Sequence, residues 1–207
     1  MKKNLIVLVA DKNMESAING ILSRHISIGI YPISYAIQIH PQHDSGVRKT
    51  GAELLRTQLN LFRHALMIYD FEGAGCEDET VKNLEDVGDK HLRQVGWENR
   101  ARTIVIHPEL DIWIWADSPH VPETLGWNND YQSLQQWLLE HGYEFNHDKK
   151  PLRPKEAMEA ILRKKRIPRS SALYKRIAQK VGFTKCTDRS FVKLTRILKR
   201  WFVLDTP

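Results

Sequence analysis

Short apolar runs alternate with amphipathic stretches over the first half of the chain. The run at residues 4–10 (NLIVLVA) predicts a buried strand, and Met14, Ile18 and Ile21 follow it at helical spacing. Strands that alternate with helices favour a mainly parallel sheet, here four-stranded, covered by helices on both faces. The same alternation predicts further strands at 34–39, 65–69 and 103–106, with helices at 51–62 and 77–95.

The pattern changes after the fourth predicted strand. Residues 111–117 (DIWIWAD) fit either an alternating strand or a short buried helix, and we favour a helical turn. Residues 148–155 (DKKPLRPK) have the composition of a linker. We therefore expect an α/β domain over residues 1–148 and a helical subdomain over residues 149–207. Amphipathic spacing and capping residues predict helices in this subdomain at 155–164, 170–181 and 188–201.

Charge divides the chain at the same place. Residues 1–148 contain 13 lysines and arginines against 21 acids, a balance of −8, whereas residues 149–207 contain 18 against 4, a balance of +14. A basic helical module of this kind binds DNA or RNA through phosphates, with salt-sensitive affinity. The alternative is that the basic face of these helices is simply solvated, or that it docks on the acidic domain of the same chain or on a partner. The candidate nucleic-acid-binding residues are Arg163, Lys164, Lys165, Arg166, Arg169, Lys175 and Arg176.

Several protein classes do not fit the sequence. No stretch approaches the roughly 18 apolar residues of a membrane span, and the first residues do not resemble a signal peptide, so we expect no membrane anchor. Cys76 and Cys186 lack metal-ligand spacing, as in a reduced cytoplasmic protein. No glycine loop of the Walker or dinucleotide type is present, so we expect no ATP or NAD binding. The tryptophans have apolar neighbours and are interpreted as core residues.

Acidic residues follow three of the four predicted strands. Asp11 follows the first, Asp70 and Glu72 follow the third (YDFEGAG), and Glu109 and Asp111 follow the fourth (HPELDIW). In a parallel sheet the carboxyl ends of the strands meet at one edge, where ligands bind. Clustered carboxylates of this kind suit Mg²⁺ or Mn²⁺. The alternative is that each acid is a solvated loop residue or a helix cap.

A second polar loop follows the second predicted strand. Its sequence at residues 40–44 is HPQHD, and we interpret its histidines as solvated residues of a proline-containing loop. If the loop overhangs the acidic edge, His43, Arg48 and Lys49 are placed to touch a substrate phosphate.

The order of these motifs resembles the Toprim-like fold of topoisomerases, primases and nucleases, and especially the small Toprim-like proteins of bacterial anti-phage defence islands. The resemblance covers roughly residues 4–117 and consists of Asp11, then Asp70-x-Glu72-Gly, then an acid before the tryptophans of LDIWIWAD. In that family a glutamate after strand one and an Asp-x-Asp motif after a later strand hold a divalent metal for phosphoryl transfer. This chain departs at both points, because Ala10 precedes Asp11 where the family has Glu-Gly, and Glu72 replaces the second aspartate.

The resemblance implies a Mg²⁺- or Mn²⁺-dependent nuclease that works with a separate ATPase partner in defence. Asp11, Asp70 and Glu72 would be catalytic, and these three with Asp111 would hold the metal. The alternative is a catalytically degenerate Toprim-like subunit that recruits nucleic acid or a partner ATPase, which the missing Glu-Gly favours. A receiver-like or flavodoxin-like regulatory domain is a third hypothesis, but the sequence shows no convincing lysine at the end of a fifth strand.

Overall fold

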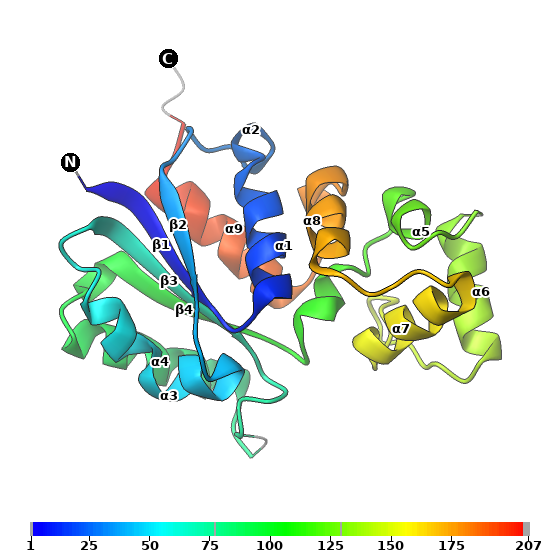
Figure 1. Cartoon of the computed structure of the whole chain (residues 1–207), viewed down its shortest axis with the longest axis horizontal. Coiled ribbons are helices and arrows are strands. Elements are labelled where there is room, and N and C mark those ends of the chain that lie inside the picture. Colours follow the sequence, from blue (N-terminus) through cyan, green and yellow to red (C-terminus); the bar gives the residue numbers. More distant parts are fainter. Residues whose placement is uncertain (1, 77, 129, 205–207) are drawn as a thin grey trace.

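Four parallel strands form one sheet in the order β2-β1-β3-β4 in the computed structural model, which describes residues 2–76, 78–128 and 130–204 (Figure 1). Val7 of β1 pairs with Ile37 on one side and with Leu66 on the other. The fold is therefore α/β with a parallel four-stranded sheet, as the alternating pattern predicts. The strands are β1 (Lys3–Val9), β2 (Tyr35–Ile39), β3 (Phe62–Asp70) and β4 (Ala101–Ile106).

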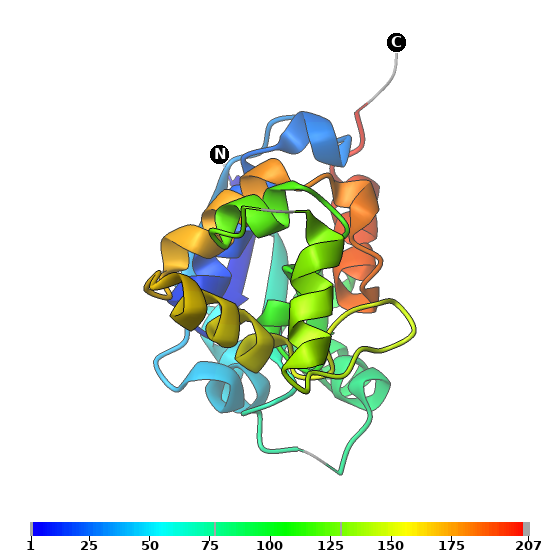
Figure 2. The same ribbon diagram turned by 90° about the vertical axis from the view of Figure 1, so that its right-hand side faces the viewer.

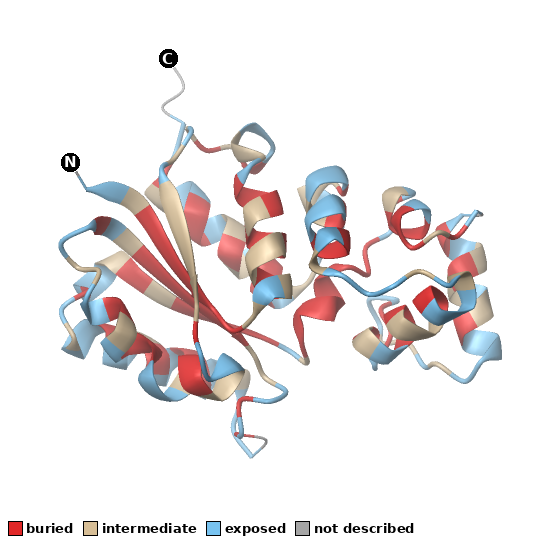
Figure 3. Cartoon of the chain, in the orientation of Figure 1, coloured by how far each residue is buried: buried red, intermediate tan, exposed pale blue. Residues whose placement is uncertain are grey.

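Helices cover both faces of this sheet. On one face lie α3 (His43–Arg56) and α4 (Val81–Gln94), and on the other lie α1 (Lys12–Leu22) and α9 (Arg189–Trp201), with the short α2 (His25–Ile28) beside α9 (Figure 1). Because both faces are covered, the inner strands are buried almost throughout (Figure 3). Continuous apolar runs are typical of strands in this position.

A cluster of helices lies beyond the carboxyl ends of the strands (Figure 2). It contains η2 (Leu110–Trp113), α5 (His120–Thr124), α6 (Tyr131–Glu140) and α7 (Pro154–Lys165). Trp113 lies in η2 and Trp115 follows it closely, and both are buried as expected for core residues. The remaining elements are η1 (Glu98–Arg100), α8 (Ser171–Lys180) and η3 (Phe183–Lys185). Among the described residues, no helix combines the length and the apolar character needed to cross a membrane.

The last two helices pack on the α/β part of the fold. Helix α8 packs along α1 and also contacts α5, and α9 packs on β4. The crossing of α1 and α8 is close, because a Cβ on Gly20 would stand 2.7 Å from the Cβ of Ala178. Arg24, at the N-cap of α2, also donates to the backbone oxygens of Ala178 and Val181 at 3.0 and 2.5 Å. The basic region that follows residue 148 therefore helps to bury the sheet.

Helix α3 begins earlier than the pattern predicts. The helix expected at 51–62 is wrong in its bounds, because α3 already starts at His43 and ends at Arg56. A Cβ on Gly46 would stand 2.2 Å from the ring of His40, and one on Gly51 would stand 2.7 Å from Sδ of Met67. Both glycines therefore allow close packing of α3, although glycine normally disfavours a helix.

Helix α4 begins later than expected and uses its own cap. The side chain of Thr80 accepts a hydrogen bond from the Asn83 N–H at 3.2 Å, so the helix starts at Val81. Glu77, where the sequence pattern predicts the start, lies outside the described residues.

Side chains block the free edge of β4. Asp89 accepts from the Thr103 N–H at 2.6 Å, and Glu85 accepts from the Val105 N–H at 3.2 Å. From the other face, Lys193 donates to the Thr103 carbonyl at 2.8 Å. Occupied backbone groups cannot pair with another strand, so this edge is protected against association.

Candidate functional site

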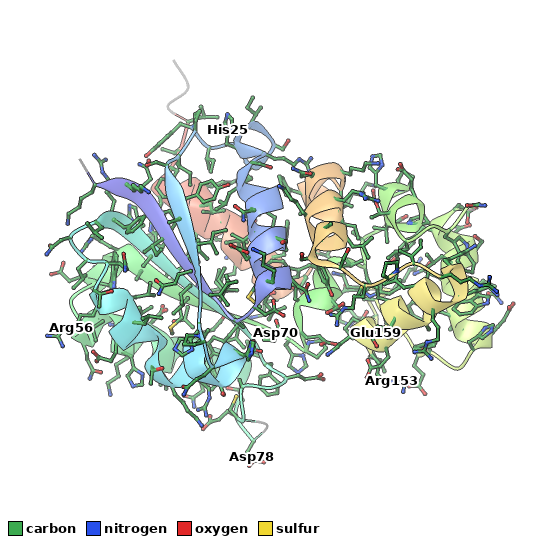
Figure 4. All side chains as sticks on the ribbon, in the orientation of Figure 1. His25, Arg56, Asp70, Asp78, Arg153 and Glu159 are labelled. Atoms are coloured by element: carbon green, nitrogen blue, oxygen red, sulfur yellow. The ribbon has the colours of Figure 1, made fainter. Side chains whose placement is uncertain are left out.

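Every strand of the sheet delivers an acid to one pocket of about 360 Å³ at the carboxyl ends of the strands. Asp11 follows β1, and Asp44 lies in the first turn of the helix that follows β2. Figure 4 shows Asp70 at the end of the sheet, on the side of α7, which carries Glu159. The six acids of the lining are Asp11, Asp44, Asp70, Glu72, Glu109 and Asp111.

The carboxyl group of Asp70 is unusual among the acids of the pocket. Its Oδ1 is buried and has no hydrogen-bond partner among the described residues. Burial raises the pKa of Asp70 well above its usual value, and the nearby charges of Asp44, Asp111 and Glu109 raise it further, whereas the Leu110 N–H lowers it. A buried carboxyl oxygen without a partner calls for an explanation, and a bound cation would provide one.

Asp44 is a site residue that the sequence analysis missed. Its Oδ1 accepts the backbone N–H of Asp70 at 2.8 Å, so the first turn of α3 is tied to the end of β3. Burial raises the pKa of Asp44, and the charge of Asp11 adds to this. The sequence does contain a signal for Asp44, because this residue also follows a predicted strand. The motif HPQHD was interpreted by its two histidines alone.

Asp11 has a structural task in addition to its place in the lining. Its Oδ1 accepts the backbone N–H of Met14 at 2.8 Å and caps α1. The strand-end acid and the helix cap, which the sequence analysis weighed as alternatives, are therefore the same residue. Glu72 also lines the pocket and is exposed, so it lies toward solvent.

Asp111 is already engaged by the helical region. Its Oδ2 and Oδ1 lie 3.2 and 3.4 Å from an Arg169 guanidinium nitrogen, and the hydroxyl of Tyr174 donates to its Oδ1 at 2.9 Å. The same hydroxyl accepts from Nε of Arg169 at 2.9 Å. Only 2% of Asp111 is exposed. The carboxylate is thus neutralised within the chain and is less available to a metal than that of Asp70.

Glu109 has a looser partner. It is buried, and Lys155 Nζ lies 3.7 Å from its Oε2. Burial raises the pKa of Glu109 to about 7, with a further contribution from the charge of Asp111, while Lys155 lowers it. This carboxyl group therefore changes its protonation state near neutral pH.

The donor set fits a hard divalent cation by its chemistry. The six acids offer oxygen ligands, and no cysteine or histidine lines the pocket. In the part of the chain that the structure describes, no three Asp, Glu, His or Cys side chains are grouped as a ready-made metal site. Mg²⁺ usually keeps several waters and needs only one or two carboxylates together with substrate phosphates. Asp70 and its neighbour Asp44 can supply these two carboxylates.

Of the three residues expected to reach a substrate phosphate from the loop after β2, Arg48 and Lys49 lie elsewhere, whereas His43 adjoins Asp44 of the pocket. Arg48 donates from Nε to the Ala74 carbonyl at 2.7 Å and from a terminal nitrogen to the Gly75 carbonyl at 3.2 Å. It therefore holds the loop that follows β3. Nδ1 of His43 lies 3.2 Å from the backbone oxygen of residue 10, and Lys49 lines a different surface pocket, between α3 and α4.

The expected nucleic-acid-binding residues lie in different places. Arg169 lines the acidic pocket. Lys164 Nζ lies 5.2 Å from the ring centre of Trp137, and Lys165 Nζ lies 4.5 Å from that of Trp127. These two lysines lie at the end of α7 remote from the pocket, roughly 15 Å along the helix. The exposed remainder, on the end of α7 and on α8, is Arg163, Arg166, Lys175 and Arg176.

Comparison with known proteins identifies no relative. No protein-family model matches the chain, and neither a curated protein nor a solved structure matches it. We therefore infer the function from the residues of the pocket.

Proposed function

We propose that the chain is a metal-dependent phosphodiesterase of the nuclease type, and that the acidic pocket is its active site. The observation that supports this most directly is the buried, unpartnered Oδ1 of Asp70 in a pocket to which every strand contributes an acid. The likeness of the motifs to Toprim-like proteins supports the same reaction.

The cation would be Mg²⁺ or Mn²⁺, held by Asp70 and Asp44 with Asp11 and Glu72 beside them. When bound, it would polarise a phosphate oxygen and lower the pKa of a water molecule. The chain itself holds these acids in place. The Asp44–Asp70 hydrogen bond fixes two of them, and the cap on α1 fixes Asp11. Fixed carboxylates lose little freedom on binding, which favours catalysis.

Nucleic acid is the proposed substrate, and a separate ATPase is the proposed partner. The exposed basic residues on α7 and α8 support the first of these, because they can follow a phosphate backbone. We place the protein in the cytoplasm of a bacterial cell, where it would act in defence against phage. The buried thiols of Cys76 and Cys186 suit a reducing compartment.

A calorimetric titration with Mn²⁺ tests the site. We expect the parent to bind the ion and Asp70→Asn to bind it at least tenfold more weakly. Asp86→Asn, an exposed acid on α4, is the matched control and should bind as the parent does. The same three proteins are then incubated with labelled single- and double-stranded DNA and RNA. Cleavage by folded Asp70→Asn at the parental rate would rule out the proposed active site.

The second candidate function is a binding subunit without catalytic activity. The observation in its favour is that Asp111 is occupied by Arg169 and Tyr174, so that one expected metal ligand is withdrawn from the pocket. This alternative predicts salt-sensitive nucleic-acid binding by fluorescence anisotropy, with no Mn²⁺ binding and no cleavage by the parent.

A further inference from the structure

The acidic pocket also contains two cations, and both come from the region that follows the sheet. Lys155 in the first turn of α7 and Arg169 just before α8 both line the pocket. The sheet and the segments that directly follow its strands supply the acids, whereas residues 155–169 supply these two cations. The pocket is therefore assembled from both parts of the chain.

The backbone at Lys155 is fixed, whereas its side chain is partly exposed and free to bind another group. The indole N–H of the buried Trp115 donates to the Pro154 carbonyl at 3.0 Å, which fixes the start of α7. The side chain of Lys155 is 44% exposed, and its contact with Glu109 is a long one at 3.7 Å. A lysine in this situation can turn to a better acceptor without disturbing the fold.

The N-terminus of α7 contributes partial positive charge near Lys155. Arg153, at the N-cap position, makes no side-chain capping bond, so its side chain does not satisfy the N–H groups of the first turn. The positive end of the helix dipole lies where Lys155 enters the pocket, and both features favour an anion there.

Arg169 is held firmly beside this position. Its guanidinium group contacts Asp111, and it donates to the Tyr174 hydroxyl from Nε at 2.9 Å and to Glu159 at 3.3 Å. Its side chain is 29% exposed. Arg169 thus presents a fixed positive charge to the pocket, whereas Lys155 presents a movable one.

The balance of charges sets an order of binding. Six acids outnumber the two cations in the lining, so the lining does not by itself attract an anion. A divalent cation held by Asp44 and Asp70 would add two positive charges and favour an anion beside it. A phosphate group could then bridge that cation and Lys155, because Mg²⁺ in proteins is usually bound by one or two carboxylates together with substrate phosphates.

We propose that Lys155, beside Arg169, binds a phosphate group of the ligand, and that this phosphate enters the pocket only after a divalent cation has bound. The inference deepens the proposed function and rests on it. The volume of about 360 Å³ lies at the lower end of the range for ligand pockets and suits one phosphate-bearing unit.

Calorimetry with inorganic phosphate as the probe tests this proposal. Phosphate is titrated into the full chain with and without saturating Mg²⁺, and we expect binding only when Mg²⁺ is present. By reciprocity, phosphate should raise the affinity for Mg²⁺ by the same factor by which Mg²⁺ raises the affinity for phosphate.

Three variants separate the role of Lys155 from a general loss of charge. Lys155→Met should weaken phosphate binding by about ten- to a hundredfold, the range expected for a lost hydrogen bond to a charged group, without weakening Mg²⁺ binding in the absence of phosphate. Lys155→Arg should keep phosphate binding within a few-fold of the parent. Lys90→Met, an exposed lysine on α4, is the control and should change neither affinity.

The possible failures are distinct. If Lys155→Met binds phosphate as the parent does, the role of Lys155 is refuted. If phosphate binds the parent equally well without Mg²⁺, the order of binding is refuted. In both cases the cation site on Asp70 stands. If the parent binds no divalent cation at all, the proposed function and this inference are both wrong.

Discussion

The backbone N–H of Asp70 donates a hydrogen bond of 2.8 Å to Oδ1 of Asp44. Asp70 ends β3, whereas Asp44 lies in the helix after β2, and β1 lies between these two strands. The bond therefore brings together acids from strands that are not neighbours. The charge of Asp44 raises the pKa of Asp70, whereas the hydrogen bond from the Asp70 N–H lowers the pKa of Asp44, which burial raises.

The bond makes a prediction about Asp44. Asp44→Ala removes the acceptor of a partly buried N–H and should lower the free energy of unfolding by about 1–3 kcal/mol. Asp44→Asn keeps an oxygen acceptor and should lose less stability, yet it should weaken Mn²⁺ binding because a charged ligand is gone. Urea denaturation and calorimetry measure the two effects. Equal Mn²⁺ affinity in the parent and in Asp44→Asn would remove Asp44 from the site.

Asp70 is expected to lower the stability of the metal-free protein. Because its pKa is raised in the folded state, the stability falls as the pH rises from about 4 toward the folded pKa, and the loss is present at neutral pH. Asp70→Asn carries no charge and should raise the free energy of unfolding by about 1 kcal/mol, or Tm by roughly 2–4 °C, in the presence of a chelator.

Scanning calorimetry with and without Mg²⁺ checks the prediction for Asp70. Mg²⁺ should stabilise the parent and leave Asp70→Asn nearly unchanged, because only the parent binds the ion well. The same Tm for both proteins in the chelator, with the same response to Mg²⁺, would contradict it.

Glu85 connects the two charged parts of the chain. It is 3% exposed, it accepts the Val105 N–H, and its Oε2 lies 2.6 Å from Arg189 and 3.0 Å from Lys193. Glu85→Ala leaves that N–H without an acceptor and should cost about 1–3 kcal/mol of unfolding free energy. Asp86→Ala, its exposed neighbour, should stay within about 0.5 kcal/mol of the parent in urea denaturation. A similar small loss in both variants would show that the contact contributes little.

His64 is expected to make the protein sensitive to acid. Its ring stacks on Trp201 at 4.5 Å and meets Phe202 edge-on at 5.3 Å, and its Nδ1 is buried without a hydrogen-bond partner among the described residues. Burial lowers the pKa of His64, and the charges of Arg100 and Arg63 lower it further, against a hydrogen bond from the imidazole to the Arg100 backbone that raises it.

The sign of this effect follows from the lowered pKa. As the pH falls below about 6.5, the unfolded chain takes up the proton first, so the stability decreases until the pH reaches the folded pKa. The difference in unfolding free energy between the parent and His64→Phe should therefore change over this range. We expect the variant to lose less stability between pH 7 and pH 5 in urea denaturation. Parallel pH profiles for the two proteins would refute the prediction.

The sheet was predictable because its signal is local. A strand buried on both faces must be apolar throughout, so residues 4–10 indicate β1 without knowledge of the fold. Helix α3 was harder to delimit, because Gly46 and Gly51 disfavour a helix by propensity and are required only by the close approach of His40 and Met67. This requirement arises from packing between segments that are distant in the sequence, so the local sequence pattern does not reveal it.

The sequence by itself determined the alternation of strands and helices, the acids at the strand ends and the division of charge near residue 148. Only the tertiary structure decided how these features are used. It added Asp44 to the pocket, engaged Asp111 with Arg169, and placed Lys155 beside Glu109 in the lining. The physical reason is that strand order and helix docking bring distant residues within a few ångströms, and the burial and charge that set their chemistry arise only there.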